Sequence, residues 1–436
     1  MTATRSALLQ WHDGLAPGQT RREGEIFVGG CSAERLADIY GTPLLAIDYG
    51  VLDAAIDEFT AAARPLGVDI AYAGKALLLV GIAKHLLATP LQIDVCSIGE
   101  LITAERAGFP AARLNLHGCG KTNDELEAAA AGRVGTIIVD NLDELRRLGE
   151  RARSARPLDV VLRMNTGIEA HTHEFMRTGG SKTKFGMPAE ALPKAADVLA
   201  SASALRYRGL HAHIGSQIYQ AQAFEANSSE LLALTARAAA LGMHGDRLIA
   251  GGGFGISMSP DDGERIDIPA TIDAMANAVR ANAARMRMPA PQIGLEPGRA
   301  LIGRAGTSLY RVMAAKEQFG TPYVVVDGGI ADNPRPALYN AYHHPLLASR
   351  KGEIERETVV CGRSCENDRI VTAPLPRDVS AGDVLAVCIT GAYTFSMASN
   401  YNRFARPAVV AVDGTTHTLL ARRETIEHVL RNDCDA

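Results

Sequence analysis

Several features that would point to particular classes of protein are scarce in this 436-residue sequence. Aromatic residues make up 5% of it, with a single Trp, and 45 Lys and Arg nearly balance 49 Asp and Glu, for a net charge of −4. Such a balance lacks the basic surface that nucleic acids and anionic membranes attract, so we expect neither as a partner. The sequence also lacks an uninterrupted apolar run of about 18 residues, which argues against a membrane-spanning helix.

Paired cysteines are lacking as well. The seven cysteines are scattered and odd in number, which indicates reduced thiols in a cytoplasmic protein rather than a disulfide framework. The first residues have no apolar core of the length found in secretory signals, which fits the same expectation. At this length we expect about two domains, because single hydrophobic cores stop growing at roughly 250–300 residues.

Residues 50–300 alternate between alanine- and leucine-rich stretches with helical spacing and short apolar runs. One helical stretch precedes the first run and seven lie between the runs. Alternation of this kind predicts a parallel sheet with helices outside it, and eight units predict a closed (β/α)₈ barrel of the TIM type over residues 44–304, although an open doubly wound sheet could share the pattern. The eight apolar runs are 69–73, 92–95, 113–116, 136–139, 159–163, 209–213, 247–250 and 292–295.

After residue 304 the sequence pattern changes to short β-like runs separated by Gly and Pro. These runs, together with 25–28 near the start, predict a mostly antiparallel β-sandwich or β-barrel domain made of residues 1–43 and 305–436. The runs are 323–326, 358–360, 384–389, 408–412 and 415–420.

Polar and glycine residues collect directly after the runs of the predicted barrel, where such a fold carries its active site. Lys75 follows the first run, and an amine in apolar surroundings there is suited to nucleophilic, Schiff-base chemistry. The glycines at 251–253 follow the seventh run and would let backbone N–H groups approach an anion such as phosphate. Each feature alone is also compatible with an ordinary strand end.

Glu296 and Arg299 follow the last run. A carboxylate there could hold a protonated pyridine nitrogen, and the guanidinium could bind a substrate carboxylate, although the two could equally form a structural ion pair. His211 and His213 would share one face of a strand, which leaves a metal-hydrolase alternative open. No further ligand spacing supports that alternative, so we expect no metal.

Three groups in the β domain are candidates as well. Cys361 and Cys365 stand four residues apart without a second pair, which is a poor zinc pattern. Arg335 and Tyr339 offer a carboxylate-binding guanidinium and a phenol, and Tyr393 adds another phenol.

Eight segments together resemble the fold-type III pyridoxal-phosphate-dependent decarboxylases, in order and over nearly the whole chain. They are YAGKA (72–76), DVCSIGEL (94–101), HIGSQ (213–217), GGGFG (251–255), EPGR (296–299), DNPRPALY (332–339), CE (365–366) and GAYTFSMASNYN (391–402). Two loops depart from the usual family pattern: Asn367, Asp368 and Arg369 follow the CE pair, and residues 118–121 read GCGK.

The resemblance implies pyridoxal 5'-phosphate as cofactor and a role for each matching residue. Lys75 would hold the cofactor, His213 would stack on its ring and Glu296 would pair with the pyridine nitrogen. The cofactor's phosphate side would be contacted by Ser216, Gly253, Gly298, Arg299 and Tyr393. The distal part of an amino-acid substrate would be bound by Arg299, Arg335, Tyr339, Tyr393 and Glu366. In this family the CE pair enters the neighbouring subunit's site, so Cys365 would be the proton donor in a homodimer with shared active sites.

The groups that could bind a distal carboxylate favour meso-2,6-diaminopimelate, decarboxylated at its D-centre to give L-lysine and CO2. The nearest alternative is a sister decarboxylase acting on another carboxylate-ended amino acid, in a siderophore or other secondary-metabolite pathway. A catalytically inactive regulatory relative is a different class of alternative, and the presence of both Lys75 and Cys365 argues against it.

Overall fold

The computed structural model describes residues 7–153, 156–168, 183–262 and 266–434. The chain divides into two compact units. The barrel unit consists of Asp57–Gly255 and Arg265–Ala300, and the β unit of Met1–Ile56, Ile256–Glu264 and Leu301–Ala436. Each unit is described by itself.

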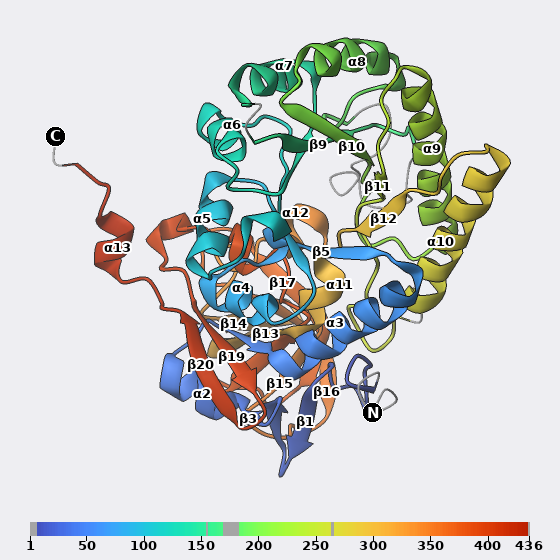
Figure 1. The fold of residues 1–436 in the computed structure, drawn as a ribbon. Coiled ribbons are helices and arrows are strands. Elements are labelled where there is room, and N and C mark those ends of the chain that lie inside the picture. Colours follow the sequence, from blue (N-terminus) through green and yellow to red (C-terminus); the bar gives the residue numbers. More distant parts are fainter. Residues whose placement is uncertain (1–6, 154–155, 169–182, 263–265, 435–436) are drawn as a thin grey trace. The chain divides into compact units, whose positions relative to one another are not determined.

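The barrel unit contains a closed barrel of eight parallel strands, as predicted (Figure 1). Every predicted run forms one strand, and β9 pairs with β10 to close the ring. The interior strand β8 is buried along its whole length and reads Thr-Ile-Ile-Val, which is typical of a parallel strand covered on both faces. The strands are β5 (Asp69–Ala73), β6 (Gln92–Val95), β7 (Leu114–Leu116), β8 (Thr136–Val139), β9 (Leu158–Arg163), β10 (Leu205–His211), β11 (Arg247–Ile249) and β12 (Gln292–Leu295).

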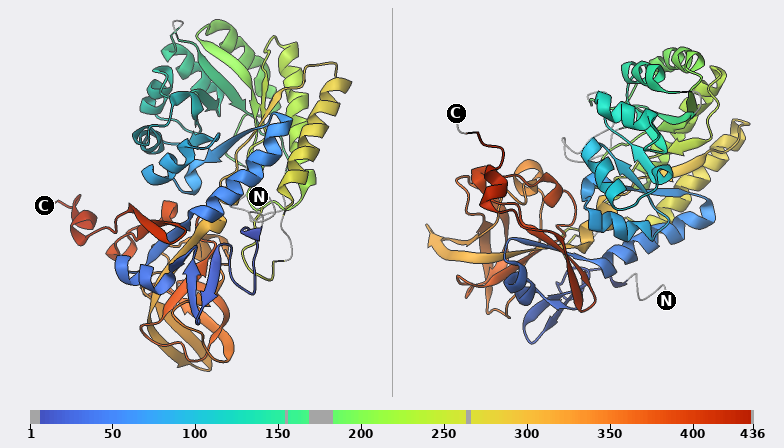
Figure 2. Two further views of the ribbon diagram at one scale, coloured as in Figure 1. Left: turned by 60° about the horizontal axis from the view of Figure 1, so that its bottom comes forward. Right: turned by 60° about the vertical axis from the view of Figure 1, so that its left-hand side comes forward.

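Among the described residues, seven helices alternate with these strands along the chain. They lie outside the strands, as both views of Figure 2 show. Side chains cap the first turns of α5, α6, α7 and α10. At the start of α6, Thr122 and Glu125 form a reciprocal capping box. The helices are α4 (Val80–Leu87), α5 (Ile98–Arg106), α6 (Asn123–Ala130), α7 (Leu142–Arg151), α8 (Leu192–Ser201), α9 (Ala221–Ala240) and α10 (Ile268–Arg285). Helix α3 (Tyr49–Ala63) precedes β5, and α11 (Arg299–Ile302) follows β12.

The β unit is built around a nine-stranded sheet that is antiparallel except for the pairs β4–β19 and β14–β16. Two clusters of buried side chains form its core, one including Leu44 and Val410 and the other Val326 and Leu385. Its strands are β4 (Leu44–Asp48), β13 (Gly306–Gln318), β14 (Thr321–Val326), β15 (Pro345–Leu347), β16 (Glu355–Cys361), β17 (Arg369–Pro376), β18 (Val384–Cys388), β19 (Ala408–Asp413) and β20 (Thr416–Ala421).

A small antiparallel sheet of β1 (Gln19–Arg22), β2 (Glu25–Val28) and β3 (Cys31–Ser32) completes the β unit, together with α2 (Ala33–Tyr40), α12 (Arg335–Tyr339) and α13 (Ile426–Leu430). Strand β4 begins at residue 44, where the barrel domain was predicted to start, and it pairs with β13 and β19 of the β unit. The limits 44–304 themselves stay a prediction. Within the described residues, no helix is both long and apolar enough to cross a membrane.

Candidate active site

The carboxyl ends of the barrel strands carry Lys75 and the residues that pack against its turn. Lys75 lies in a single 3₁₀ turn, Gly74–Ala76, immediately after β5. Its side chain is exposed, although we expected apolar surroundings, whereas its neighbours Gly74, Ala76 and Leu77 are buried. A Cβ placed on Gly298 would lie 3.2 Å from the Cβ of Ala76. The loop after β12 therefore lies directly against the turn that presents the lysine amine.

The loop after β11 can only be made with glycine. A Cβ on Gly252 would come within 2.0 Å of the carbonyl oxygen of Glu296, and one on Gly253 within 2.2 Å of the carbonyl oxygen of Gly215. Gly253 also has a φ of +104°, which L-residues rarely adopt. Because side chains are excluded, backbone groups line this part of the barrel rim, as a bound phosphate requires.

Ser216 and Arg299, two residues predicted at the cofactor site, lie together. An Nη of Arg299 donates to the hydroxyl of Ser216 over 3.4 Å, and the guanidinium is buried. On the other side of the glycine loop, the backbone N–H of Gly252 donates to Nδ1 of His213 over 3.1 Å. Burial lowers the pKa of His213 well below its usual range. A neutral imidazole that accepts at Nδ1 is the form suited to lying against an aromatic ring.

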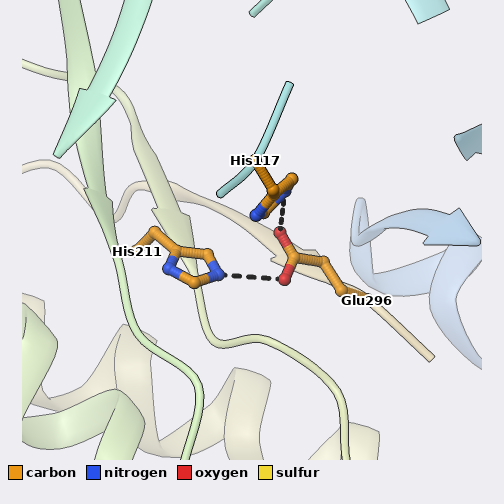
Figure 3. A group of neighbouring side chains, drawn as sticks. All are labelled: His117, His211 and Glu296. Carbon is orange, nitrogen blue, oxygen red and sulfur yellow. Dashed lines mark hydrogen bonds and ion pairs between the residues drawn. The ribbon is translucent and has the colours of Figure 1, made fainter. Parts of the chain in front are cut away.

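Glu296 is held between two imidazoles (Figure 3). Its Oε2 lies 2.9 Å from Nε2 of His211, and its Oε1 lies 3.3 Å from Nε2 of His117. The latter contact is an ion pair without hydrogen-bond geometry, so the buried Oε1 accepts no hydrogen bond from the described residues. Asp94 stands behind His117, with Oδ1 3.5 Å from Nε2.

The side chains of this buried group strongly affect one another's pKa. Burial disfavours the carboxylate form of Glu296, but His211 and His117 outweigh it and keep its pKa well below the usual range. Burial likewise disfavours a charged His117, but Glu296 and Asp94 raise the pKa of His117 to about 9. Burial lowers the pKa of His211 to about 4. At neutral pH the group therefore consists of an anionic Glu296, a cationic His117 and a neutral His211.

The histidines that the structure joins are not the pair expected for the metal alternative. Among the described residues, the group that could hold a metal ion is His117, His211 and Glu296, whose ligand atoms lie within 4.8 Å of one another. His213 is not part of it, because β10 ends at His211 and the two-residue alternation of side chains does not continue beyond the strand.

The residues predicted in the β unit form two clusters of their own. In the first, α12 begins at Arg335 after Pro334, and the buried guanidinium lies 4.8 Å from the ring centre of Tyr339 and 5.4 Å from that of Tyr393. Tyr393 has a φ of 61°, an uncommon backbone conformation for a residue other than glycine. Both rings are thus within cation–π distance of a guanidinium, the planar group that binds carboxylates through two parallel hydrogen bonds.

In the second cluster, Cys365 and Glu366 lie exposed on a loop that residues 401–402 hold in place. The backbone N–H of Cys365 donates to Oδ1 of Asn402 over 3.0 Å, and the phenol of Tyr401 donates to Oε1 of Glu366 over 2.8 Å. Asp368 is buried and accepts from the backbone N–H of Ile330. Asp368, one of the three residues that depart from the family pattern after the CE pair, therefore helps to anchor the loop that carries Cys365 and Glu366.

Sequence reasoning assigned no role at the site to His117, Asp94 or the pair Lys121–Glu144 that supports the loop of His117. His117 follows β7 directly and Asp94 lies within β6, so the rule that polar residues at strand ends form the site could have identified His117. Nothing in the sequence indicated that an acid inside β6 and a lysine four residues beyond His117 belong to the same cluster.

Comparisons with known proteins support the resemblance that the sequence motifs indicated. The family model described as "Pyridoxal-dependent decarboxylase, pyridoxal binding domain" matches residues 52–303. The chain belongs to this family of pyridoxal-dependent decarboxylases. The resemblance inferred from the motifs is therefore confirmed.

Relatives of this decarboxylase are similar over almost their full length. It is 40% identical over 426 residues to diaminopimelate decarboxylase of Actinosynnema pretiosum, covering 96% of this chain and 95% of the relative. The corresponding Bacillus subtilis protein is 38% identical, with 94% and 96% covered. Among solved structures, M. jannaschii diaminopimelate decarboxylase in co-complex with L-lysine superposes with a TM-score of 0.89 at 28% identity, covering 96% and 98% of the two chains.

Proposed function

We propose that this decarboxylase removes the carboxylate from the D-centre of meso-2,6-diaminopimelate, giving L-lysine and CO2. The observation that carries the proposal is the joining of Lys75, Glu296 and the glycine loop at one end of the barrel, in a chain similar over nearly its whole length to diaminopimelate decarboxylases. The co-complex of one such relative with L-lysine supports lysine as the product.

The residues present fit pyridoxal phosphate. Glu296 offers a buried, anionic oxygen that accepts no hydrogen bond from the described residues and can take one from a protonated ring nitrogen. Lys75 would hold the cofactor through its amine, and the glycine rim with Ser216 would receive the phosphate. When bound, the cofactor supplies an electron-withdrawing ring that takes up the electron pair left behind as CO2 departs.

The side chains of the site would have separate roles toward the cofactor and the substrate. Glu296 would keep a proton on the ring nitrogen, and the neutral His213 would lie against the ring. Arg299 and Arg335, supported by Tyr339 and Tyr393, bind the distal carboxylate that distinguishes diaminopimelate from lysine and ornithine.

We infer a homodimer in which each site takes residues from both chains. Cys365 of one chain would deliver the proton to the carbon that has lost CO2, and Glu366 would bind the distal ammonium. Their loop is exposed in a single chain and anchored at residues 401–402, which is what a loop that enters a neighbouring subunit needs.

The substrate is tested by measuring CO2 release from meso-diaminopimelate, L-lysine, L-ornithine and L-arginine with the cofactor saturating. We expect release from meso-diaminopimelate alone, and Arg335→Gln should raise KM for it more than it lowers kcat. Release from another carboxylate-ended amino acid in its place would favour the sister-decarboxylase alternative.

A further inference from the structure

His117 contacts the carboxylate of the proposed ring-nitrogen site although no motif points to it. Figure 3 shows its imidazole on the Oε1 side of Glu296, opposite His211. Its Nε2 lies 3.3 Å from Glu296 and 3.5 Å from Asp94, so one imidazole N–H faces two carboxyl groups. The rings of His117 and His211 meet edge to face at 5.3 Å, which leaves little room for either to turn.

The loop that carries His117 is fixed at both ends. At its start, the backbone N–H of His117 donates to the carbonyl of Val95 over 2.7 Å. At its end, the amine of Lys121 donates to the carbonyl of Gly118 over 2.9 Å and pairs with Glu144 of α7 at 2.8 Å. Both members of this ion pair are almost completely buried. The loop that carries the imidazole is therefore held by a backbone hydrogen bond at its start and by a buried ion pair at its end.

The charges around His117 explain why a cation is needed there. Asp94 and Glu296 face His117 directly, and Arg163 acts on His211 and Glu296. Farther from His117 are His213, which Lys75 and Arg163 influence, and Asp140, which pairs with Arg163. Burial disfavours the ionised form of Asp94, whose pKa is raised, and His211 is neutral. Burial favours protonation of Glu296 as well, and the contacts with His211 and His117 oppose it. A protonated Glu296 cannot stabilise a proton on the ring nitrogen.

We propose that His117 is a positioning residue: as an imidazolium it holds Glu296 ionised and oriented, so that the cofactor's ring nitrogen stays protonated. This inference rests on the proposed function. His117 itself acts through Glu296 and is not required to touch the cofactor or the substrate.

The first test uses the cofactor-free protein and needs no activity. Imidazole ¹⁵N NMR, with the His117 signal assigned from its loss in His117→Gln, should show His117 still protonated at about pH 8, well above the ordinary histidine pKa of about 6.5. Asp94→Asn, which leaves both His117 and Glu296 in place, should lower its titration midpoint. A neutral His117 at that pH would overturn the proposal.

The second test uses the enzyme loaded with pyridoxal phosphate. His117→Gln keeps an N–H donor without the charge, and we expect the absorption spectrum of the bound cofactor to titrate at lower pH, with kcat reduced roughly 10–100-fold, as for other residues that orient a site from behind. His244→Gln, an exposed histidine of the same unit, serves as the matched control and should leave both unchanged.

The outcomes separate this proposal from the proposed function. If the wild-type protein binds pyridoxal phosphate and releases CO2 from meso-diaminopimelate, but His117→Gln has the same cofactor titration and kcat, the role of His117 is refuted and the function stands. If the wild-type protein does neither, the proposed function fails, while the NMR titration still decides the charge of His117.

Discussion

Removing the amine of Lys121 should destabilise the barrel far more than an ordinary ion-pair deletion. In Lys121→Met the carbonyls of Gly118 and Ile138 and the carboxylate of Glu144 all lose the same donor, and the contacts to Ile138 and Glu144 are buried. Breaking a buried ion pair from one side typically costs about 3–5 kcal/mol, because the remaining charge has no compensation. We therefore expect a loss of about that size in the free energy of unfolding.

The loss should depend on pH. Burial already raises the pKa of Glu144 while Lys121 opposes it, so in the variant the pKa of this acid rises further. An acid whose pKa is higher in the folded than in the unfolded state loses stability as pH rises above its unfolded value of about 4.3. The deficit of Lys121→Met should accordingly be larger at about pH 8 than at about pH 4.

The assay is urea unfolding followed by far-UV circular dichroism, with hydrogen exchange of residues 117–121 as a local measure. Lys121→Met combined with Glu144→Leu should recover most of the stability, because it removes the unpaired charge. As a control, Arg403→Met breaks the exposed pair with Asp433 and should cost under about 1 kcal/mol. If the Lys121 variant cost no more than this control, the reasoning about the buried support would be refuted.

Three further predictions concern other parts of the molecule. Burial raises the pKa of Asp332 to about 7, so wild-type stability should fall as pH rises from about 4 to 7, and Asp332→Asn should flatten that slope in unfolding measurements. Gly252→Ala should reduce the pyridoxal phosphate bound after dialysis, because its Cβ would meet a carbonyl oxygen at 2.0 Å, whereas Gly120→Ala, with nothing within 4 Å, should not. A mixture of Lys75→Ala and Cys365→Ala subunits should regain activity that neither variant has alone; no regain after subunit exchange would contradict a shared site.

The barrel could be predicted from sequence because its signal is local and repeated. Each run from 69–73 to 292–295 became a strand, and the helices lie between them as expected. Buried parallel strands are short and continuously apolar, whereas apolar residues in the alanine-rich helices recur with helical spacing. The two sequence patterns are therefore easy to tell apart.

Strands β13 and β17 are among the strands of the β unit that escaped prediction, and each did so for a physical reason. Strand β13 ends in Met-Ala-Ala-Lys-Glu-Gln, which favours a helix by propensity, but pairing with β14 outweighs that preference. Strand β17 contains two prolines and reads as a loop, yet it lies at the edge of the sheet, where a missing N–H is tolerated.

The same contrast holds for the site. Lys75, Glu296 and the glycines are visible in the sequence because each directly follows an apolar run. The contact of His117 with Glu296 depends on how strands far apart in the chain close into a ring, and no local pattern encodes it.

The central claim is that Lys75 holds pyridoxal phosphate in a decarboxylase site, and borohydride reduction tests it most directly. Reduction of the yellow protein followed by peptide mass mapping should place the reduced cofactor on the peptide that contains Lys75, and Lys75→Ala should carry none there. A reduced cofactor mapped to a different lysine, or no cofactor trapped in the wild-type protein, would contradict the account.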